Sequence, residues 1–237
     1  MNKDLYLENR EYVNDAFSQQ KRLIGFKDKK IIFDVGAHIG EISELYTRLF
    51  PKHEIHSFEP YKDSFSKLLE KSEKNINIIP NQIALGSNIG KKFLNNNVAS
   101  PTNSFLETHE KASYYWSAQW CTTIEKIEVD VTTIDYYCKE KNISKIDVLK
   151  LDTQGYEFEI LKGAESMLSN NQISLIYSEV ILSSTYINQK SLAQITDYLD
   201  TFGYRLFNIY NPAISKNKEL NQIDVIFILS SEKLKDI

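Results

Sequence analysis

Short apolar runs alternate along this chain with longer stretches whose apolar residues recur at helical spacing. Runs rich in Ile, Val, Leu and Phe predict buried strands, and the helical spacing between them predicts amphipathic helices. Predicted strands occupy 30–35, 54–58, 76–85, 147–151, 173–180, 204–209 and 223–229, and predicted helices occupy 41–50, 61–74, 133–142, 156–168 and 189–202. This alternation predicts an α/β fold with a seven-stranded, mostly parallel, doubly wound sheet. Because a turn-rich loop without a helix joins the last two strands, the last strand is expected to be antiparallel.

Two segments depart from this alternation. Residues 4–24 place Leu, Tyr, Val, Ala and Phe at near-helical spacing, which predicts one or two helices covering the sheet edge or a cofactor. From about 87 to 128 the periodicity is lost, except for a final alternating run that predicts a strand from Glu125 to Val131. A loop this long inside a compact domain is usually functional or mobile. The sequence therefore predicts an N-terminal helical cover at 1–29 and one domain at 30–237 with an insert at about 87–128.

Composition narrows the classes of function. With 237 residues, of which 42% are hydrophobic and 25% charged, the chain is long enough for one large core. A net charge of -4 argues against a general nucleic-acid binder, which would need a basic face. No apolar leader and no apolar run of about 18 residues is present, so no membrane span is expected. The two cysteines make no disulfide framework, and we expect a reduced, cytoplasmic protein.

The stretch at residues 30–40, KIIFDVGAHIG, organises the rest of the chain. It reads as a buried strand, a tight turn with glycines four apart, and the start of a helix. Gly36 and Gly40 lack a Cβ, so the backbone can take a positive φ and a ligand can approach it closely. This arrangement places a small ligand over the end of a parallel sheet. We therefore predict that Gly36, Ala37, His38 and Gly40 contact a cofactor.

Two carboxylates suggest which cofactor. Glu59 follows Gly40 by nineteen residues and ends the next apolar run, where a carboxylate usually binds the two hydroxyls of a ribose. The turn lacks the third glycine of a dinucleotide site, and Asp34 would repel a pyrophosphate but suits an ammonium group. S-adenosylmethionine has a ribose at one end and an ammonium at the other, so it is favoured over NAD or FAD. Its adenine is expected over the tip of strand 76–85, near Gln82 and Ala84.

Several ordered blocks then resemble one family. They read FDVGAHIG (33–40), FEP (58–60), IALG (83–86), VTTID (131–135) and LKLDTQGYE (149–157), the last followed by LKGA (161–164). Together they resemble the FkbM family of S-adenosylmethionine-dependent methyltransferases. The resemblance implies a Rossmann-like class I methyltransferase fold. It also implies an enzyme that methylates a hydroxyl oxygen, since members act on macrolides and on sugars. The chain departs at His38, where the family commonly has Asn. The family's Asp-x-Glu-Gly often appears with Gln in place of Glu, as here at Gln154, so no acid role is assigned to that position.

Methyl transfer to an alcohol needs a base or a metal that acidifies the hydroxyl. Asp152 and Glu179 stand at the tips of two predicted strands, near where the methyl group should lie. Both are oxygen ligands and can hold Mg²⁺. Alternatively, Asp152 holds the amino group of the cofactor and a histidine takes the proton, with His38 as the candidate. Glu179 also fits a capping or ion-paired role, and His38 also fits a loop side chain without chemistry.

Candidate acceptor contacts lie mainly in the insert. Asn103 and Ser104 occupy a place where the family tends to have similar residues, and Tyr186 is another such position. Trp116 and Trp120 belong to an aromatic cluster that fits either a sugar-stacking platform or a lid packed on the core.

The predicted function is O-methylation of a sugar hydroxyl, on a nucleotide sugar or a surface polysaccharide precursor. A macrolide or other secondary metabolite ranks second as acceptor. A catalytically silent cofactor-binding partner and an NAD-dependent sugar-modifying enzyme are the other hypotheses. The acceptor and the oligomeric state, including a homodimer, are left open by the sequence.

Overall fold

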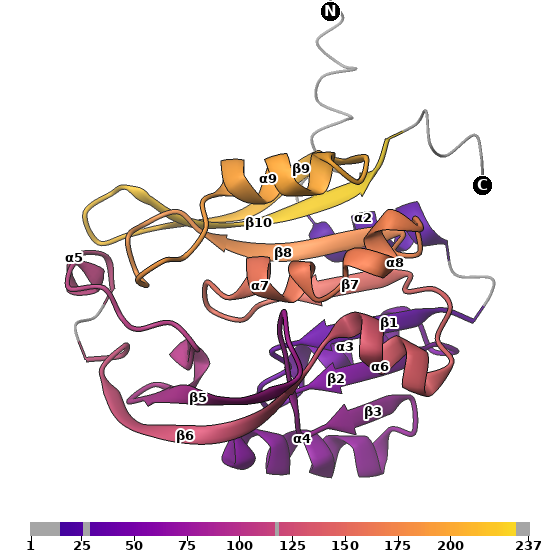
Figure 1. Cartoon of the computed structure of the whole chain (residues 1–237), viewed down its shortest axis with the longest axis horizontal. Coiled ribbons are helices and arrows are strands. Elements are labelled where there is room, and N and C mark those ends of the chain that lie inside the picture. Colours follow the sequence, from indigo (N-terminus) through magenta and orange to yellow (C-terminus); the bar gives the residue numbers. More distant parts are fainter. Residues whose placement is uncertain (1–14, 26–28, 117–118, 231–237) are drawn as a thin grey trace, which may run out of the picture.

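A seven-stranded sheet forms the centre of the computed structural model, which describes residues 15–25, 29–116 and 119–230. Its strands are β1 (Ile31–Val35), β2 (Glu54–Phe58), β3 (Ile78–Asn81), β7 (Val148–Leu151), β8 (Leu175–Ile181), β9 (Tyr204–Ile214) and β10 (Leu220–Leu229). Their order across the sheet is β3-β2-β1-β7-β8-β10-β9 (Figure 1). β10 pairs antiparallel with both β8 and β9, whereas the pairings among β3, β2, β1, β7 and β8 are parallel. The predicted seven-stranded, mostly parallel sheet with a reversed last strand is confirmed.

Helices cover both faces of this sheet. Against one face lie α6 (Ile134–Lys141), α7 (Glu157–Lys162), α8 (Glu165–Ser169) and α9 (Leu192–Asp200). Against the other face lie α2 (Ala16–Ile24) and α3 (Glu41–Leu49). The remaining long helix, α4 (Lys62–Lys74), packs beside β3 (Figure 1). Each face has its own buried apolar cluster, centred on Phe33 and Leu149 on one side and on Ile32 and Val148 on the other. Neighbouring residues of β1 and β7 therefore point to opposite faces, as strand geometry requires.

The single helix predicted at 156–168 is wrong, because the structure has two short helices there. Between α7 and α8, the Gly163 carbonyl oxygen accepts from the Asp135 N–H at 3.0 Å instead of from the next helical turn, and a Cβ at Gly163 would lie 2.0 Å from the carbonyl oxygen of Gly86. The second helix has its own cap. Both carboxylate oxygens of Asp135 accept hydrogen bonds from the backbone N–H groups of Ser166 and Met167, at 2.8 and 3.0 Å.

The insert forms a second, smaller sheet, which the sequence did not predict. Its strands are β4 (Ala84–Leu85), β5 (Gly90–Asn97) and β6 (Thr123–Thr132), in the order β4-β6-β5, and η1 (Ser100–Thr102) and α5 (Ala112–Tyr115) lie between β5 and β6. The prediction of one strand at 76–85 is also wrong, since β3 pairs with β2 and β4 pairs with β6. The hydrophobic pattern missed β5 because Asn95, Asn96 and Asn97 fill three of its four buried positions and make side-chain hydrogen bonds there.

The described part of the N-terminal segment covers the sheet. In α2, Phe17 packs edge-on against Tyr46 and Tyr177, with ring centroids 5.6 and 5.5 Å apart, and Gln20 accepts a hydrogen bond from the Tyr46 hydroxyl at 2.9 Å. These partners belong to the face that α3 covers, so α2 extends the sheet cover. The predictions for residues 1–14 lie outside the described residues.

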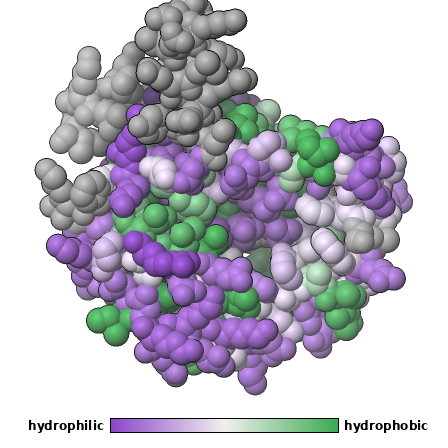
Figure 2. Space-filling model, turned by 180° about the vertical axis from the view of Figure 1, so that it is seen from behind, coloured by the Kyte–Doolittle hydropathy of each residue, from purple (hydrophilic) through white to green (hydrophobic). Residues whose placement is uncertain are grey.

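The surface of the protein is mostly hydrophilic. In the view from behind, hydrophilic side chains cover most of the coloured face, and hydrophobic side chains form separate areas around a hollow (Figure 2). Within the described ranges, no helix has the length and apolar character needed to cross a membrane.

Candidate active site

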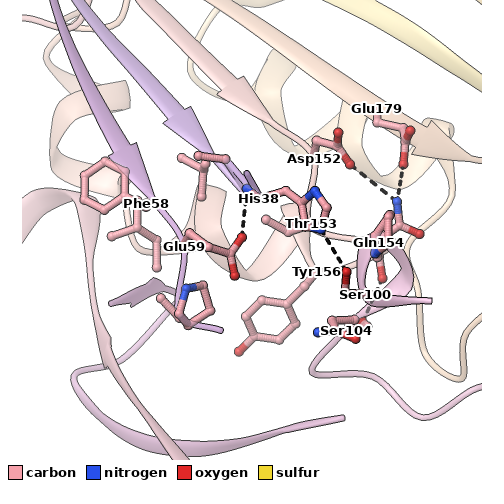
Figure 3. Close-up of a pocket in the computed structure, with 18 of the residues that line it drawn as sticks. His38, Phe58, Glu59, Ser100, Ser104, Asp152, Thr153, Gln154, Tyr156 and Glu179 are labelled. Atoms are coloured by element: carbon pink, nitrogen blue, oxygen red, sulfur yellow. Dashed lines mark hydrogen bonds between the residues drawn. The ribbon is translucent and has the colours of Figure 1, made fainter. Parts of the chain in front are cut away.

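A cavity of about 530 Å³ lies over the carboxyl ends of β1, β2, β7 and β8. This edge is where open parallel sheets bind ligands, and the volume is in the range of small-molecule sites. The insert sheet and η1 contribute the facing wall (Figure 3). Predicted site residues that line the cavity are Gly36, Ala37, His38, Glu59, Ala84, Asn103, Ser104, Asp152 and Glu179.

The glycine turn ties three strand ends together. Gly36 has φ +72, and a Cβ there would lie 1.8 Å from the carbonyl oxygen of Asp152. The N–H groups of Gly36 and Ala37 both donate to the carbonyl oxygen of Phe58, at 3.1 and 3.0 Å. The turn therefore joins β1 to β2 and admits no side chain against β7.

Gly40 has a different role from the one predicted. It caps α3 with φ +79, and a Cβ there would lie 2.7 Å from the Leu68 side chain of α4. It does not line the cavity. Its missing side chain serves the packing of α3 against α4, and the prediction of a cofactor contact is corrected.

Glu59 lies at the tip of β2 as a buried carboxylate with a fixed orientation. Its Oε2 accepts from the His38 N–H at 2.9 Å (Figure 3), and its Oε1 accepts from the Tyr61 N–H at 2.8 Å. Burial raises the pKa of Glu59 to about 7, although both N–H groups favour its charged form. Hydroxyl groups of a ligand that donate to this carboxylate would stabilise its charge further. The group therefore fits a pair of ribose hydroxyls.

The prediction that Asp34 meets the cofactor ammonium is wrong. Side chains alternate between the two faces along β1, so Asp34 points to the same face as Ile32, which α3 covers. The Asp34 side chain is fully buried there. Its Oδ1 lies 2.9 Å from Nζ of Lys150, and its Oδ2 accepts from the Ser43 hydroxyl at 2.6 Å. Asp34 is thus paired inside the protein and does not line the cavity.

Lys150 is a residue that the sequence reasoning missed. It stands directly opposite Asp34 in the parallel pairing of β1 with β7, and its Nζ also lies 3.2 Å from the Gly36 carbonyl oxygen and 3.5 Å from Oδ2 of Asp152. Burial alone would lower the pKa of Lys150, but the carboxylates of Asp34, Asp152 and Glu179 raise it above its usual value. The signal available in the sequence was a lone charge within the apolar run VLKL of β7.

Asp152 and Glu179 meet through an amide. Nε2 of Gln154 lies 2.8 Å from Oε2 of Glu179 and 3.4 Å from Oδ1 of Asp152 (Figure 3). A cation between the two carboxylates would need oxygen ligands, whereas the group that reaches both is an N–H donor. In the part of the chain that the structure describes, no three His, Cys, Asp or Glu side chains form a metal-binding group. The donor set therefore does not fit the predicted Mg²⁺ site.

His38 is joined to the insert. Its Nε2 lies 2.9 Å from the hydroxyl of Ser100 in η1, and both residues line the cavity (Figure 3). Burial lowers the pKa of His38 below its usual value, which outweighs the opposite effect of Glu41. A neutral imidazole at pH 7 can accept a proton, so His38 keeps that chemistry available.

Four predicted residues lie away from this cavity. Gln82 is exposed between β3 and β4, because β3 ends at Asn81. Trp116 donates from Nε1 to the Thr185 hydroxyl at 2.8 Å and lines a separate hollow, and Trp120 is 52% exposed. Tyr186 is buried behind the cavity wall. Their predicted contacts with adenine or acceptor in the cavity are therefore corrected.

The sequence of this site belongs to a known family pattern. The family model of the Methyltransferase FkbM domain matches residues 34–206, which is most of the chain. The chain belongs to the FkbM methyltransferase family. It is accordingly an S-adenosylmethionine-dependent methyltransferase with the class I methyltransferase fold, and the resemblance of the sequence blocks is confirmed.

Similar proteins include one named for 2-O-methyl transfer and one named for methylation of a hexuronic acid. "2-O-methyltransferase NoeI" of Sinorhizobium fredii is 24% identical over 193 residues, covering 74% of this chain and 73% of that protein. "Hexuronic acid methyltransferase AglP" of Haloferax volcanii is 25% identical over 146 residues, covering 61% and 54%. The solved FkbM methyltransferase of Methylobacillus flagellatus KT superposes with a TM-score of 0.54 at 16% identity, covering 91% of this chain and 49% of that one. At that identity the structural match supports the fold alone.

Proposed function

We propose that this FkbM methyltransferase transfers a methyl group to a hydroxyl oxygen of a sugar, on a nucleotide sugar or a polysaccharide precursor. The observation that carries the proposal is one continuous cavity with a ribose-type carboxylate at one end and a cluster of amide, hydroxyl and carboxylate groups at the other. The name of AglP supports the choice of a sugar-like acceptor, and the name of NoeI supports transfer to an oxygen.

The order of the strands supports a direction for the cofactor. Along the edge β2-β1-β7-β8 the cavity meets Glu59, the Gly36 turn, Asp152 and Glu179 in that order. Glu59 would hold the ribose, the turn and Asp152 would hold the methionine part, and the apolar surface of Ala84 would face adenine. When bound, S-adenosylmethionine supplies a methyl group on a positively charged sulfur.

Glu179 lies beyond Asp152 on this edge, which makes it the best placed carboxylate for the acceptor hydroxyl. Burial, followed by the charges of Asp152 and Glu157, raises the pKa of Glu179 well above its usual value. A carboxylate with a raised pKa is a stronger base and better matched to taking a proton from an alcohol. Glu179 would accept that proton as the hydroxyl oxygen attacks. His38 is the second candidate, because its neutral ring also lines the cavity.

The charges of the lining favour a neutral sugar ring. Among the described residues that line the cavity, Lys150 is the only Lys or Arg, and it is paired with Asp34 and Asp152. Asn103, Ser104 and Gln154 offer amide and hydroxyl groups suited to sugar hydroxyls. A carboxylate or phosphate next to the reacting hydroxyl would meet Asp152 and Glu179 instead of a free cation.

Labelled methyl transfer to a panel of acceptors tests the proposal. The panel holds neutral hexosides, nucleotide sugars, hexuronic acids and a macrolide aglycone, with and without EDTA. We expect transfer to a neutral sugar hydroxyl that persists in EDTA and falls about 100-fold or more in Glu179→Gln. Glu140→Gln, an exposed carboxylate on α6, is the matched control. Transfer to the macrolide alone, or to no acceptor despite tight S-adenosylhomocysteine binding, would reject the proposal. Binding of NAD without S-adenosylhomocysteine would reject the whole assignment.

A further inference from the structure

Gln154 makes hydrogen bonds to both carboxylates, Asp152 and Glu179. It follows β7 by three residues and has a left-handed backbone, with φ 56. The Ser104 hydroxyl donates to its carbonyl oxygen at 2.8 Å, which fixes the backbone against the insert. Its side-chain Nε2 then reaches Oε2 of Glu179 at 2.8 Å (Figure 3). A left-handed backbone costs energy for a residue with a side chain, so the surrounding contacts must hold Gln154 in this conformation.

Tyr186 lies against the other end of this amide. Its hydroxyl oxygen lies 3.0 Å from both Oε1 of Gln154 and the Thr102 carbonyl oxygen, and its single proton is shared between these two acceptors. Charged carboxylates can only accept hydrogen bonds, so the NH₂ end of Gln154 faces Glu179 and Asp152 and its Oε1 faces the Tyr186 hydroxyl. Tyr186 is 2% exposed and does not line the cavity, and its contact with Gln154 connects it to the two carboxylates.

Glu179 is held by a second amide on its other side. Nε2 of Gln222 on β10 lies 2.6 Å from Oε1 of Glu179. Each carboxylate oxygen therefore receives one N–H donor, which fixes the plane of the group while one lone pair of each oxygen remains. Neutral donors suit this place because a carboxylate at position 154 would add a like charge beside Glu179.

The charged groups facing Glu179 come from several elements. Asp152 lies on the adjoining tip, Glu157 on α7 and Asp224 on β10, and all three disfavour its charged form. Lys150 on β7 acts in the opposite direction. Donation from the amides also favours the charged form. Losing one amide should therefore raise the pKa of Glu179 further and free its orientation.

We propose that Gln154, held by Tyr186, is the positioning residue that aims the Glu179 carboxylate at the acceptor hydroxyl. The proposal rests on the proposed function, in which Glu179 takes the proton of that hydroxyl. It assigns Tyr186 a role behind the site in place of the substrate contact predicted from sequence. Neither residue contacts Glu59, and Gln154 reaches Asp152 only at 3.4 Å against 2.8 Å for Glu179, so cofactor affinity should change less than turnover.

Turnover and cofactor binding of three variants test this. In Gln154→Ala we expect kcat to fall about 10- to 100-fold, while the Kd for S-adenosylhomocysteine changes less than about threefold. In Tyr186→Phe, which keeps the ring, we expect the same pattern with a smaller loss. Tyr204→Phe is the control, because its buried hydroxyl donates to the Ile173 carbonyl oxygen at 2.6 Å, away from the cavity. Wild-type kcat in Gln154→Ala would overturn the proposal, as would an equal loss of cofactor affinity.

A readout without acceptor separates this proposal from the proposed function. Carbon-13 NMR of labelled glutamate carboxyls, assigned with Glu179→Gln, follows the pKa of Glu179 directly. We expect that pKa to rise in Gln154→Ala by roughly one unit and to stay unchanged in Tyr204→Phe. An unchanged pKa in Gln154→Ala overturns the positioning role even when no sugar acceptor is found. A raised pKa together with no transfer to any sugar would leave the amide contact supported and reject only the acceptor.

Discussion

Removal of the Lys150 ammonium is the perturbation that the structure defines most sharply. The Lys150 side chain is 5% exposed, and its Nζ lies between Asp34, Asp152 and the Gly36 carbonyl oxygen. Lys150→Met keeps the length of the side chain and removes its charge. Asp34, whose side chain is fully buried, would then keep its charge without a cation.

The expected loss follows from that burial. Breaking a buried ion pair by removing one partner costs about 3–5 kcal/mol, because the remaining charge is desolvated and unpaired. For a domain of this size, about 2–4 °C of Tm is lost per kcal/mol, so Tm should fall by roughly 6–20 °C. The double variant Asp34→Asn, Lys150→Met removes both charges and should recover most of this loss.

Urea unfolding and S-adenosylhomocysteine titration of the two variants check this reasoning. The double variant should regain stability but not full cofactor affinity, since Nζ of Lys150 also holds the glycine turn and Asp152. Lys162→Met is the matched control, because its pair with Glu159 is 45% and 30% exposed and should contribute less than about 1 kcal/mol. A wild-type urea midpoint for Lys150→Met, or a double variant as unstable as the single one, would refute it.

Three further predictions concern the turn, the ribose carboxylate and a buried histidine. Glu59→Gln should weaken S-adenosylhomocysteine binding by about 1–3 kcal/mol in calorimetry, and unchanged affinity would place the ribose elsewhere. Gly36→Ala should abolish that binding, because its Cβ would lie 1.8 Å from the Asp152 carbonyl oxygen, and wild-type binding would contradict this geometry. Burial lowers the pKa of His56 to about 4, so the unfolded chain binds a proton between about pH 6.5 and 4 that the folded chain does not. Stability from His56 is therefore lost as pH falls through this window, by about 3 kcal/mol at most. Urea unfolding of His56→Gln should lack that loss, and the comparison at each pH cancels the opposite contribution of Glu59, whose pKa is raised.

Local patterns in the sequence were enough for the order of the elements and for part of the site. The glycine turn and Glu59 follow apolar runs immediately, and a residue at the end of a parallel strand lies at the ligand-binding edge whatever the rest of the fold does. Asp152 and Glu179 could be placed near the cavity for the same reason. The prediction of one helix at 156–168 failed because the hydrogen bonds that interrupt it, between Asp135 and residues 163–167, join segments far apart in the chain.

The amino-acid sequence by itself determined the alternating elements, the reversed last strand and the identity of the cofactor-binding edge, because hydrophobic period and strand ends are local properties. Only the tertiary structure decided what the charged groups do. Asp34 turned inward to Lys150 because the period of two and the register of β1 with β7 put the two side chains opposite each other. Gln154 lies between Asp152 and Glu179 because β7 and β8 are neighbours in the sheet. The pairing of β7 with β8 depends on the packing of helices on both faces of the sheet, and no single segment of the sequence encodes it.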